Sequence, residues 1–120
     1  MKILIVDDSK AMRMIIKRIL RQTDIDSHET IEAENGQEGL TKVESENPDL
    51  VISDWNMPVM TGIEFLKSVR ENGNNVKFGF VTTESSGKMR DIALEAGANF
   101  LISKPFTPDS FEESIKPVLA

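Results

Sequence analysis

The sequence contains no cysteine and no tyrosine, and only one tryptophan and one histidine among its 120 residues. Without cysteine it has no disulfide framework, no thiolate nucleophile and no cysteine-ligated metal site. Near the N-terminus the first apolar run, residues 3–6, is too short for a signal peptide or a membrane span and ends at two aspartates. We therefore expect a cytoplasmic protein with no membrane insertion.

Basic residues are also in the minority, with 14 lysines and arginines against 20 acidic residues and a net charge of -6. An acidic chain repels phosphate backbones, so we expect no nucleic-acid binding. The sequence lacks a glycine-rich phosphate loop, which argues against nucleotide binding. Its length is typical of one ordinary domain, and we predict a single domain over residues 1–120.

Five short apolar or β-branched segments alternate with helical patterns along the chain. The segments predicted to be strands are residues 3–6, 30–33, 50–53, 78–81 and 100–102. Capping residues mark several helix starts, such as Ser9 before the first helix and Thr107 before the last. This alternation predicts an α/β fold, a doubly wound parallel sheet with helices on both faces.

Helical spacing is clearest after residue 9 and weaker toward the C-terminus. The core-facing stripe expected for the first helix is Met12, Ile15, Ile16, Ile19 and Leu20. Gly97 is expected to end the fourth helix. Pro117 indicates that the last helix frays close to the chain end.

Polar side chains follow four of the five predicted strands. They are Asp7 and Asp8 after the first, Asp54 after the third, Thr82 after the fourth and Lys104 after the fifth. Because the carboxyl ends of parallel strands meet at one edge of a sheet, we expect these groups to converge. Each alone has an ordinary explanation as a capping or surface residue, but the combination favours a functional site.

Three clustered carboxylates repel one another, and a hard divalent cation removes that conflict. Oxygen ligands suit Mg²⁺, with Mn²⁺ as an alternative occupant. Such a site is typical of phosphoryl transfer, in which a carboxylate can act as the nucleophile and form an aspartyl-phosphate. An ammonium and a hydroxyl can then each hold one phosphoryl oxygen.

Four motifs together resemble the receiver domain of two-component response regulators. They are Val6-Asp7-Asp8-Ser9, Asp54-Trp55-Asn56-Met57-Pro58 with Gly62 after it, Val81-Thr82, and Lys104-Pro105-Phe106. The resemblance covers essentially the whole chain. Within the family, the chain is similar to the single-domain chemotaxis regulators. It implies a flavodoxin-like (βα)5 fold with strand order 2-1-3-4-5.

The resemblance also implies how the site is used. A histidine kinase would transfer a phosphoryl group to Asp54 in a Mg²⁺-dependent step. Asp8 and Asp54 would bind the metal directly, Asp7 through water and Asn56 through its backbone carbonyl. Two positions, Asn56 and Glu84, would tune how fast the phosphate hydrolyses.

Thr82 and Lys104 would sense the phosphoryl group and move the loops and the last strand. At the switch position, where the family often has Tyr or Phe, this sequence has Leu101. The adjacent Phe100 cannot replace such an aromatic residue, since neighbouring strand residues face opposite sides. Thr83 stands where small residues are common, and we expect it to restrict access to the pocket.

These features predict a phosphorylation-activated signalling switch, not an enzyme beyond its own phosphotransfer and autodephosphorylation. The expected partners are a CheA-like histidine kinase and a downstream protein, with the flagellar motor switch as one candidate, and we expect a monomer. A phosphate sink, or a regulator of a kinase or signalling enzyme, remains an alternative. An aspartate-nucleophile phosphohydrolase is less favoured, because such enzymes carry Asp-x-Asp after the first strand. Trp55 could be a partner contact or a partly exposed anchor.

Overall fold

The computed structural model describes residues 1–23, 29–83 and 86–119. Its strands are β1 (Lys2–Val6), β2 (Glu29–Ala33), β3 (Leu50–Ser53), β4 (Lys77–Thr82) and β5 (Phe100–Ser103). Its helices are α1 (Lys10–Gln22), α2 (Gly36–Glu46), α3 (Gly62–Glu71), α4 (Gly87–Glu95) and α5 (Pro108–Leu119). All paired strands are parallel, in the order β2-β1-β3-β4-β5. The predicted fold class and strand order are confirmed.

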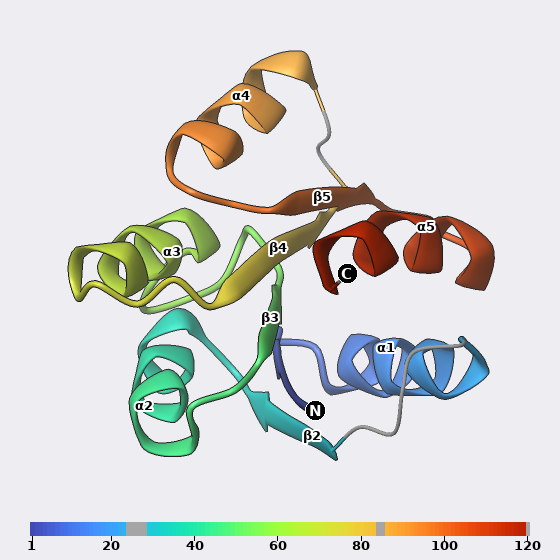
Figure 1. The fold of residues 1–120 in the computed structure, drawn as a ribbon, viewed down its shortest axis with the longest axis horizontal. Coiled ribbons are helices and arrows are strands. Elements are labelled where there is room, and N and C mark those ends of the chain that lie inside the picture. Colours follow the sequence, from blue (N-terminus) through green and yellow to red (C-terminus); the bar gives the residue numbers. More distant parts are fainter. Residues whose placement is uncertain (24–28, 84–85, 120) are drawn as a thin grey trace.

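Helices cover both faces of the sheet, with α1 and α5 on one face and α2, α3 and α4 on the other (Figure 1). Side chains alternate between the faces along each strand, so β1 sends Leu4 and Val6 to the second face and Ile3 and Ile5 to the first. Two apolar clusters result, one on each face. Every residue from Ile3 to Val6 is buried, which explains the unbroken apolar run of β1.

Capping side chains fix the starts of the helices. Ser9 accepts a hydrogen bond from the backbone N–H of Met12, and Thr61 forms a reciprocal capping box with Glu64. Gly97, with a φ of 104°, follows the end of α4 in a conformation that favours glycine. Helix α5 continues through Pro117 to Leu119, so the expected fraying at Pro117 is not found.

The buried face of α1 differs from the predicted stripe at one residue. Ile15 is 44% exposed, whereas Arg13 is only 7% exposed. The helix is centred on Ile16 and Leu20, so residue 15 lies at one border of the packed face and residue 13 at the other, beside β2. The prediction for Ile15 was therefore wrong, because apolar character alone does not locate the border of a buried stripe. In the described part of the chain, no helix combines the length and apolar character needed to cross a bilayer.

On β5, Phe100 and Leu101 enter opposite clusters, as strand alternation predicts. Phe100 lies over Gly79 of β4, where any side chain would collide with the ring. The glycine that interrupts the apolar run of β4 therefore makes room for an aromatic side chain on the neighbouring strand.

Candidate functional site

The carboxyl ends of β1 and β3 place two aspartates side by side. Asp7 donates its backbone N–H to Ala33 O at 3.1 Å, and Asp54 donates its own to Val6 O at 2.8 Å. These bonds extend the sheet ladder one residue beyond each strand, so both aspartates start from a fixed backbone. Asp7, Asp8 and Asp54 each present a carboxylate oxygen, and the three oxygens lie within 4.8 Å of one another.

Lys104 joins this group from the end of β5. Its backbone N–H donates to Thr82 O at 2.8 Å, which fixes the first residue after the strand. Its side chain is 15% exposed, and Nζ lies 3.6 Å from Asp54 Oδ1 and 3.8 Å from Asp7 Oδ2. One ammonium therefore faces two carboxylates, which leaves the cluster of four charged groups with an excess of negative charge.

Asp7 is the most buried of the three acids, at 2% exposure. Its Oδ1 accepts a hydrogen bond from the backbone N–H of Ser9 at 2.9 Å, but its buried Oδ2 has no hydrogen-bond partner among the described residues. Burial raises the pKa of Asp7 to about 6, and the charges of Asp54 and Asp8 add to this while Ser9 and Lys104 offset part of it.

Asp54 sits in a similar environment but has better partners. Its Oδ1 accepts the backbone N–H of Trp55 at 2.8 Å, and its side chain is 14% exposed. Burial is the main cause that raises the pKa of Asp54, and Lys104 and the Trp55 N–H oppose that effect. The Asp54 side chain therefore keeps partial contact with solvent.

The donor set fits a hard divalent cation. All three acids offer oxygen, the ligand atom that Mg²⁺ prefers, and the buried Asp7 Oδ2 accepts no hydrogen bond from any residue that the structure describes. A cation near this oxygen would also favour the charged forms of Asp7 and Asp54, which burial disfavours. The residues present therefore match the expected Mg²⁺ site.

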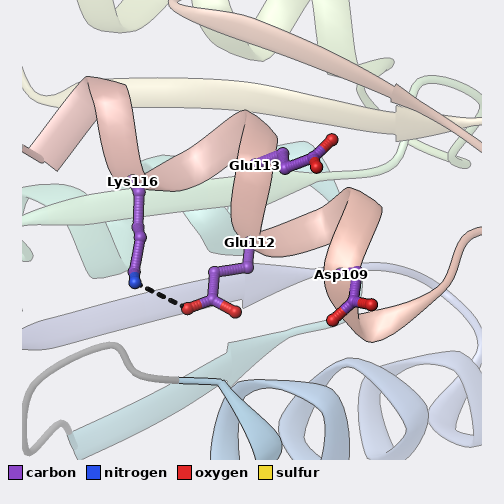
Figure 2. Close-up of a pocket in the computed structure, with 4 residues that line it drawn as sticks. All are labelled: Asp109, Glu112, Glu113 and Lys116. Carbon is purple, nitrogen blue, oxygen red and sulfur yellow. Dashed lines mark ion pairs between the residues drawn. The ribbon is translucent and has the colours of Figure 1, made fainter.

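A second set of acidic side chains, on α5, does not have the arrangement that a metal site needs. Asp109, Glu112, Glu113 and Lys116 line a hollow there, and Glu113 points away from Glu112 (Figure 2). Glu112 is already paired with Lys116 at 2.8 Å. Within the described residues, Asp7, Asp8 and Asp54 form the one group of three or more acidic or histidine side chains close enough to share an ion.

The remaining predicted site residues differ in their surroundings. Thr82 is fully buried at the end of β4, at the same sheet edge as the acids, and Thr83 beyond it is exposed. Asn56 is exposed two residues after Asp54. Leu101 is 6% exposed and packs in the cluster under α3 and α4. The position predicted to tune hydrolysis, Glu84, lies outside the described residues.

Trp55 is buried and is not the partly exposed anchor that was one of its two interpretations. It is 8% exposed and packs against Phe80, with ring centroids 4.8 Å apart. The interpretation as a partly exposed anchor was wrong, because the chain turns inward directly after Asp54, and a contact with a partner stays a prediction. Gly62 N–H donates to Trp55 O at 2.8 Å, and a side chain at Gly62 would collide with the carbonyl oxygen of Asp54. Close approach of α3 thus fixes the loop that carries the acid.

One residue near the site was missed by the sequence interpretation. Arg13 reaches from α1 to the backbone carbonyl of Asp7, with Nη1 2.6 Å from the oxygen. The available signal was a basic residue at the border of the apolar stripe of a helix that follows two aspartates. That pattern alone does not distinguish a buried arginine from an exposed one.

Fold and site together define a doubly wound α/β domain with a carboxylate and lysine site at the carboxyl edge of its sheet. Residues 3–116 match the family model of the response regulator receiver domain, and the chain belongs to that family. Receiver domains act as signalling switches and are not enzymes in the usual sense.

Several known proteins are similar over nearly the full length. The chemotaxis protein CheY of Pseudomonas aeruginosa is 42% identical, with 98% of this chain and 95% of the relative covered. The chemotaxis protein CheY1 of Helicobacter pylori is 40% identical, with 99% and 97% covered. The crystallised chemotaxis protein CheY4 of Vibrio cholerae has a TM-score of 0.86 at 34% identity, with 98% and 97% covered.

Proposed function

We propose that this chain is a single-domain chemotaxis response regulator that is activated by phosphorylation of Asp54. The observation that carries the proposal is the position of Lys104 Nζ, 3.6 Å from Asp54 Oδ1, beside the oxygens of Asp7 and Asp8. The proposal assigns to this edge of the sheet a nucleophilic carboxylate, a cation-binding pair and a phosphate-binding ammonium. The similar proteins named CheY support the role in chemotaxis.

In the proposed reaction a carboxylate oxygen of Asp54 attacks the phosphorus of a phosphohistidine. A P–O bond forms, the P–N bond of the donor breaks, and the electron pair of that bond leaves with the histidine nitrogen. Asp8, Asp54 and the backbone carbonyl of Asn56 would hold Mg²⁺, and Asp7 would bind it through water. When bound there, Mg²⁺ would supply neutralisation of the charge on the transferring oxygens.

Lys104 keeps the product in place by pairing with one phosphoryl oxygen, and Thr82 hydrogen-bonds another. Both residues stand at the ends of neighbouring strands, so the new contacts pull on the β4–β5 edge. Leu101 lies in the packed core, three residues before Lys104 in the sequence. The signal therefore passes through backbone and packing changes, without a swinging aromatic side chain at residue 101.

The proposed phosphodonor is a CheA-like histidine kinase, and the output is binding to a downstream protein such as the flagellar motor switch. Asn56 and Glu84 set the phosphate lifetime, and Thr83 narrows the pocket mouth. We further propose a cytoplasmic monomer formed by one domain. Phosphorylation-dependent capture of a partner separates this role from that of a phosphate sink.

The test uses the purified protein, Mg²⁺ and acetyl phosphate, followed by intact-protein mass measurement. One added phosphoryl group is expected in the wild type, and none in Asp54→Asn. The matched control is Asp91→Asn, on the exposed surface of α4, which keeps the adduct. A wild type without an adduct contradicts the proposal, and sustained release of phosphate from many phosphomonoesters supports a phosphohydrolase instead.

A further inference from the structure

Arg13 is a buried cation that makes contacts on two sides. Its side chain is 8% exposed, its Nη1 donates to Asp7 O at 2.6 Å, and its Nε donates to Glu32 Oε1 at 2.9 Å. Glu32 belongs to β2, and its second oxygen accepts a hydrogen bond from Lys17 at 3.1 Å. The guanidinium therefore joins α1, β2 and the turn after β1.

Hydrophobic packing does not explain this arginine. A buried guanidinium loses hydration, and it is tolerated where charged or polar partners replace the lost water. Here one of those partners is the carbonyl of Asp7, whose carboxylate Oδ2 has no hydrogen-bond partner in the described part of the chain. A contact of 2.6 Å to a charged donor is short, so this backbone oxygen is held firmly.

The bond matters because the turn after β1 has few other restraints. Asp7 N–H is bonded to Ala33 O, and Asp7 Oδ1 is bonded to Ser9 N–H. Asp8, the exposed acid of the cluster, lies between these anchors. The peptide that joins Asp7 to Asp8 carries the carbonyl held by Arg13, so the orientation of this peptide sets where the Asp8 side chain starts.

We propose that Arg13 is a positioning residue for the metal site, which raises Mg²⁺ affinity by fixing the Asp7–Asp8 peptide, with Glu32 as its anchor on β2. The inference rests on the proposed function, since it assumes that Asp7, Asp8 and Asp54 bind Mg²⁺. Arg13 touches neither the cation nor the phosphoryl group in this scheme. Its effect is exerted through the carbonyl that it holds.

The positive charge of Arg13 and its positioning of the turn have opposite effects on Mg²⁺ affinity. The direction of the change in affinity when Arg13 is replaced therefore tests the proposal. As a positive charge near the site, Arg13 repels a cation, so its removal should strengthen Mg²⁺ binding if charge alone matters. If it positions the turn, its removal should weaken binding. Loss of an outer partner that orients metal ligands costs about 10- to 100-fold in affinity in other metal sites.

The experiment measures Mg²⁺ affinity by titration of the fluorescence of Trp55, which directly follows Asp54 and is the sole tryptophan. Arg13→Gln should weaken binding about 10-fold. The matched control is Lys17→Gln, which removes the other cation from Glu32 without touching Asp7, and it should stay within about 2-fold of the wild type. Glu32→Gln, at a half-exposed strand position, should weaken binding in the same direction but less, because it loosens the anchor of Arg13.

Phosphorylation by acetyl phosphate supplies the second readout. In Arg13→Gln the Mg²⁺ concentration for half-maximal rate should rise, while the rate at saturating Mg²⁺ should approach that of the wild type. Urea unfolding checks that each variant is folded. If Arg13→Gln does not fold, the Mg²⁺ affinity of Glu32→Gln tests the proposal in its place.

Three results overturn the inference alone: unchanged or tighter Mg²⁺ binding in Arg13→Gln, an equal loss in Lys17→Gln, or, where Arg13→Gln does not fold, unchanged binding in Glu32→Gln. A wild type that binds Mg²⁺ but gains no phosphoryl group overturns the proposed function while the binding comparison still decides the role of Arg13. A wild type that binds no Mg²⁺ overturns both.

Discussion

The two edges of the sheet differ in how well their polar groups are hydrogen-bonded. At the carboxyl edge, Asp7 Oδ2 is buried and has no hydrogen bond to residues 1–23, 29–83 or 86–119, and burial raises the pKa of both Asp7 and Asp54. At the amino edge, the polar groups are paired. Asp49 Oδ2 accepts the Lys2 backbone N–H at 2.7 Å, and Asn99 exchanges hydrogen bonds with the backbone of Phe78.

Arg70 is the centre of the amino edge. It donates to Gly97 O at 2.8 and 3.2 Å and to Asn74 O at 2.9 Å, and so ties the end of α3 to the loops before β4 and β5. Comparison with Arg13 is instructive, because each arginine holds backbone carbonyls at one edge. At the amino edge Arg70 pairs with backbone carbonyls, whereas at the carboxyl edge the buried Asp7 Oδ2 has no hydrogen-bond partner among the described residues. With the function proposed above, the contacts for stability and those for function are separated along the strand direction.

The largest effect should come from breaking the amino edge. Arg70→Ala leaves Gly97 O and Asn74 O without their donor, and we expect a loss of about 2–4 kcal/mol in the free energy of unfolding by urea. Lys67→Ala, at an exposed position of the same helix, should change it by less than about 0.5 kcal/mol. Mg²⁺ affinity of folded Arg70→Ala should equal that of the wild type. A large drop in affinity would show that the two edges are coupled.

At the carboxyl edge, removing a charge should raise the free energy of unfolding instead of lowering it. Asp7→Asn abolishes a carboxylate that burial disfavours, and we expect the free energy of unfolding at pH 7 without Mg²⁺ to rise by about 1–2 kcal/mol. This is less than the full value of the pKa shift, because solvent reaches the open side of the cluster. Added Mg²⁺ should stabilise the wild type more than the variant.

The comparison acid is Asp49, at the other edge. Asp49→Asn exchanges a carboxylate that accepts a good hydrogen bond, so it should lower stability or leave it unchanged. Equal stabilisation by both substitutions would mean that reducing the net negative charge of the protein, and not the site of Asp7, is the cause.

The pH dependence of the free energy of unfolding, measured without metal, also tests whether the buried Asp7 carboxylate destabilises the protein. Because the pKa of Asp7 is raised to about 6, its favourable contribution is complete below the unfolded value of 3.8 and is lost as the pH rises through about 6. The advantage of Asp7→Asn over the wild type should therefore be near zero at about pH 4, grow through about pH 6 and level off above it. Urea unfolding of both proteins across this range measures it, and an advantage independent of pH would contradict the assignment.

The fold could be predicted from the sequence because the signals are local. The apolar runs of β1 and β3 and the capping residues Ser9 and Thr107 act within a few positions, and the structure has them as expected. Long-range polar contacts gave no such signal. Arg70 meets Gly97, 27 positions later, and nothing near either residue in the sequence indicates the pairing.

The site was predictable to the same degree. The convergence of Asp7, Asp8 and Asp54 followed from strand ends, but the difference between Asp7 and Asp8 did not. Adjacent aspartates look equivalent in the sequence, yet one is 2% exposed and the other is exposed. Burial depends on which way the chain turns after the strand, and here Arg13 and Ser9 hold that turn.

The smallest expected effect concerns backbone strain in the loop between Asp54 and α3. Val59 has a φ of 68° and is 81% exposed, and Met60 N–H donates to Pro58 O at 2.7 Å across this tight turn. A β-branched residue in the left-handed region costs about 1–2 kcal/mol, whereas glycine costs about 0.5–1 kcal/mol in chain entropy. Val59→Gly should therefore raise the free energy of unfolding by less than about 1 kcal/mol.

Asn47 provides the control, since it has a φ of 47° at the end of α2, where asparagine is well tolerated. Asn47→Gly should gain less than Val59→Gly in the same urea measurement. If the two gains are equal, the loop beside Asp54 stores no more strain than an ordinary helix end. The contrast between the edges would then rest on charge alone, and Asp7 would account for it.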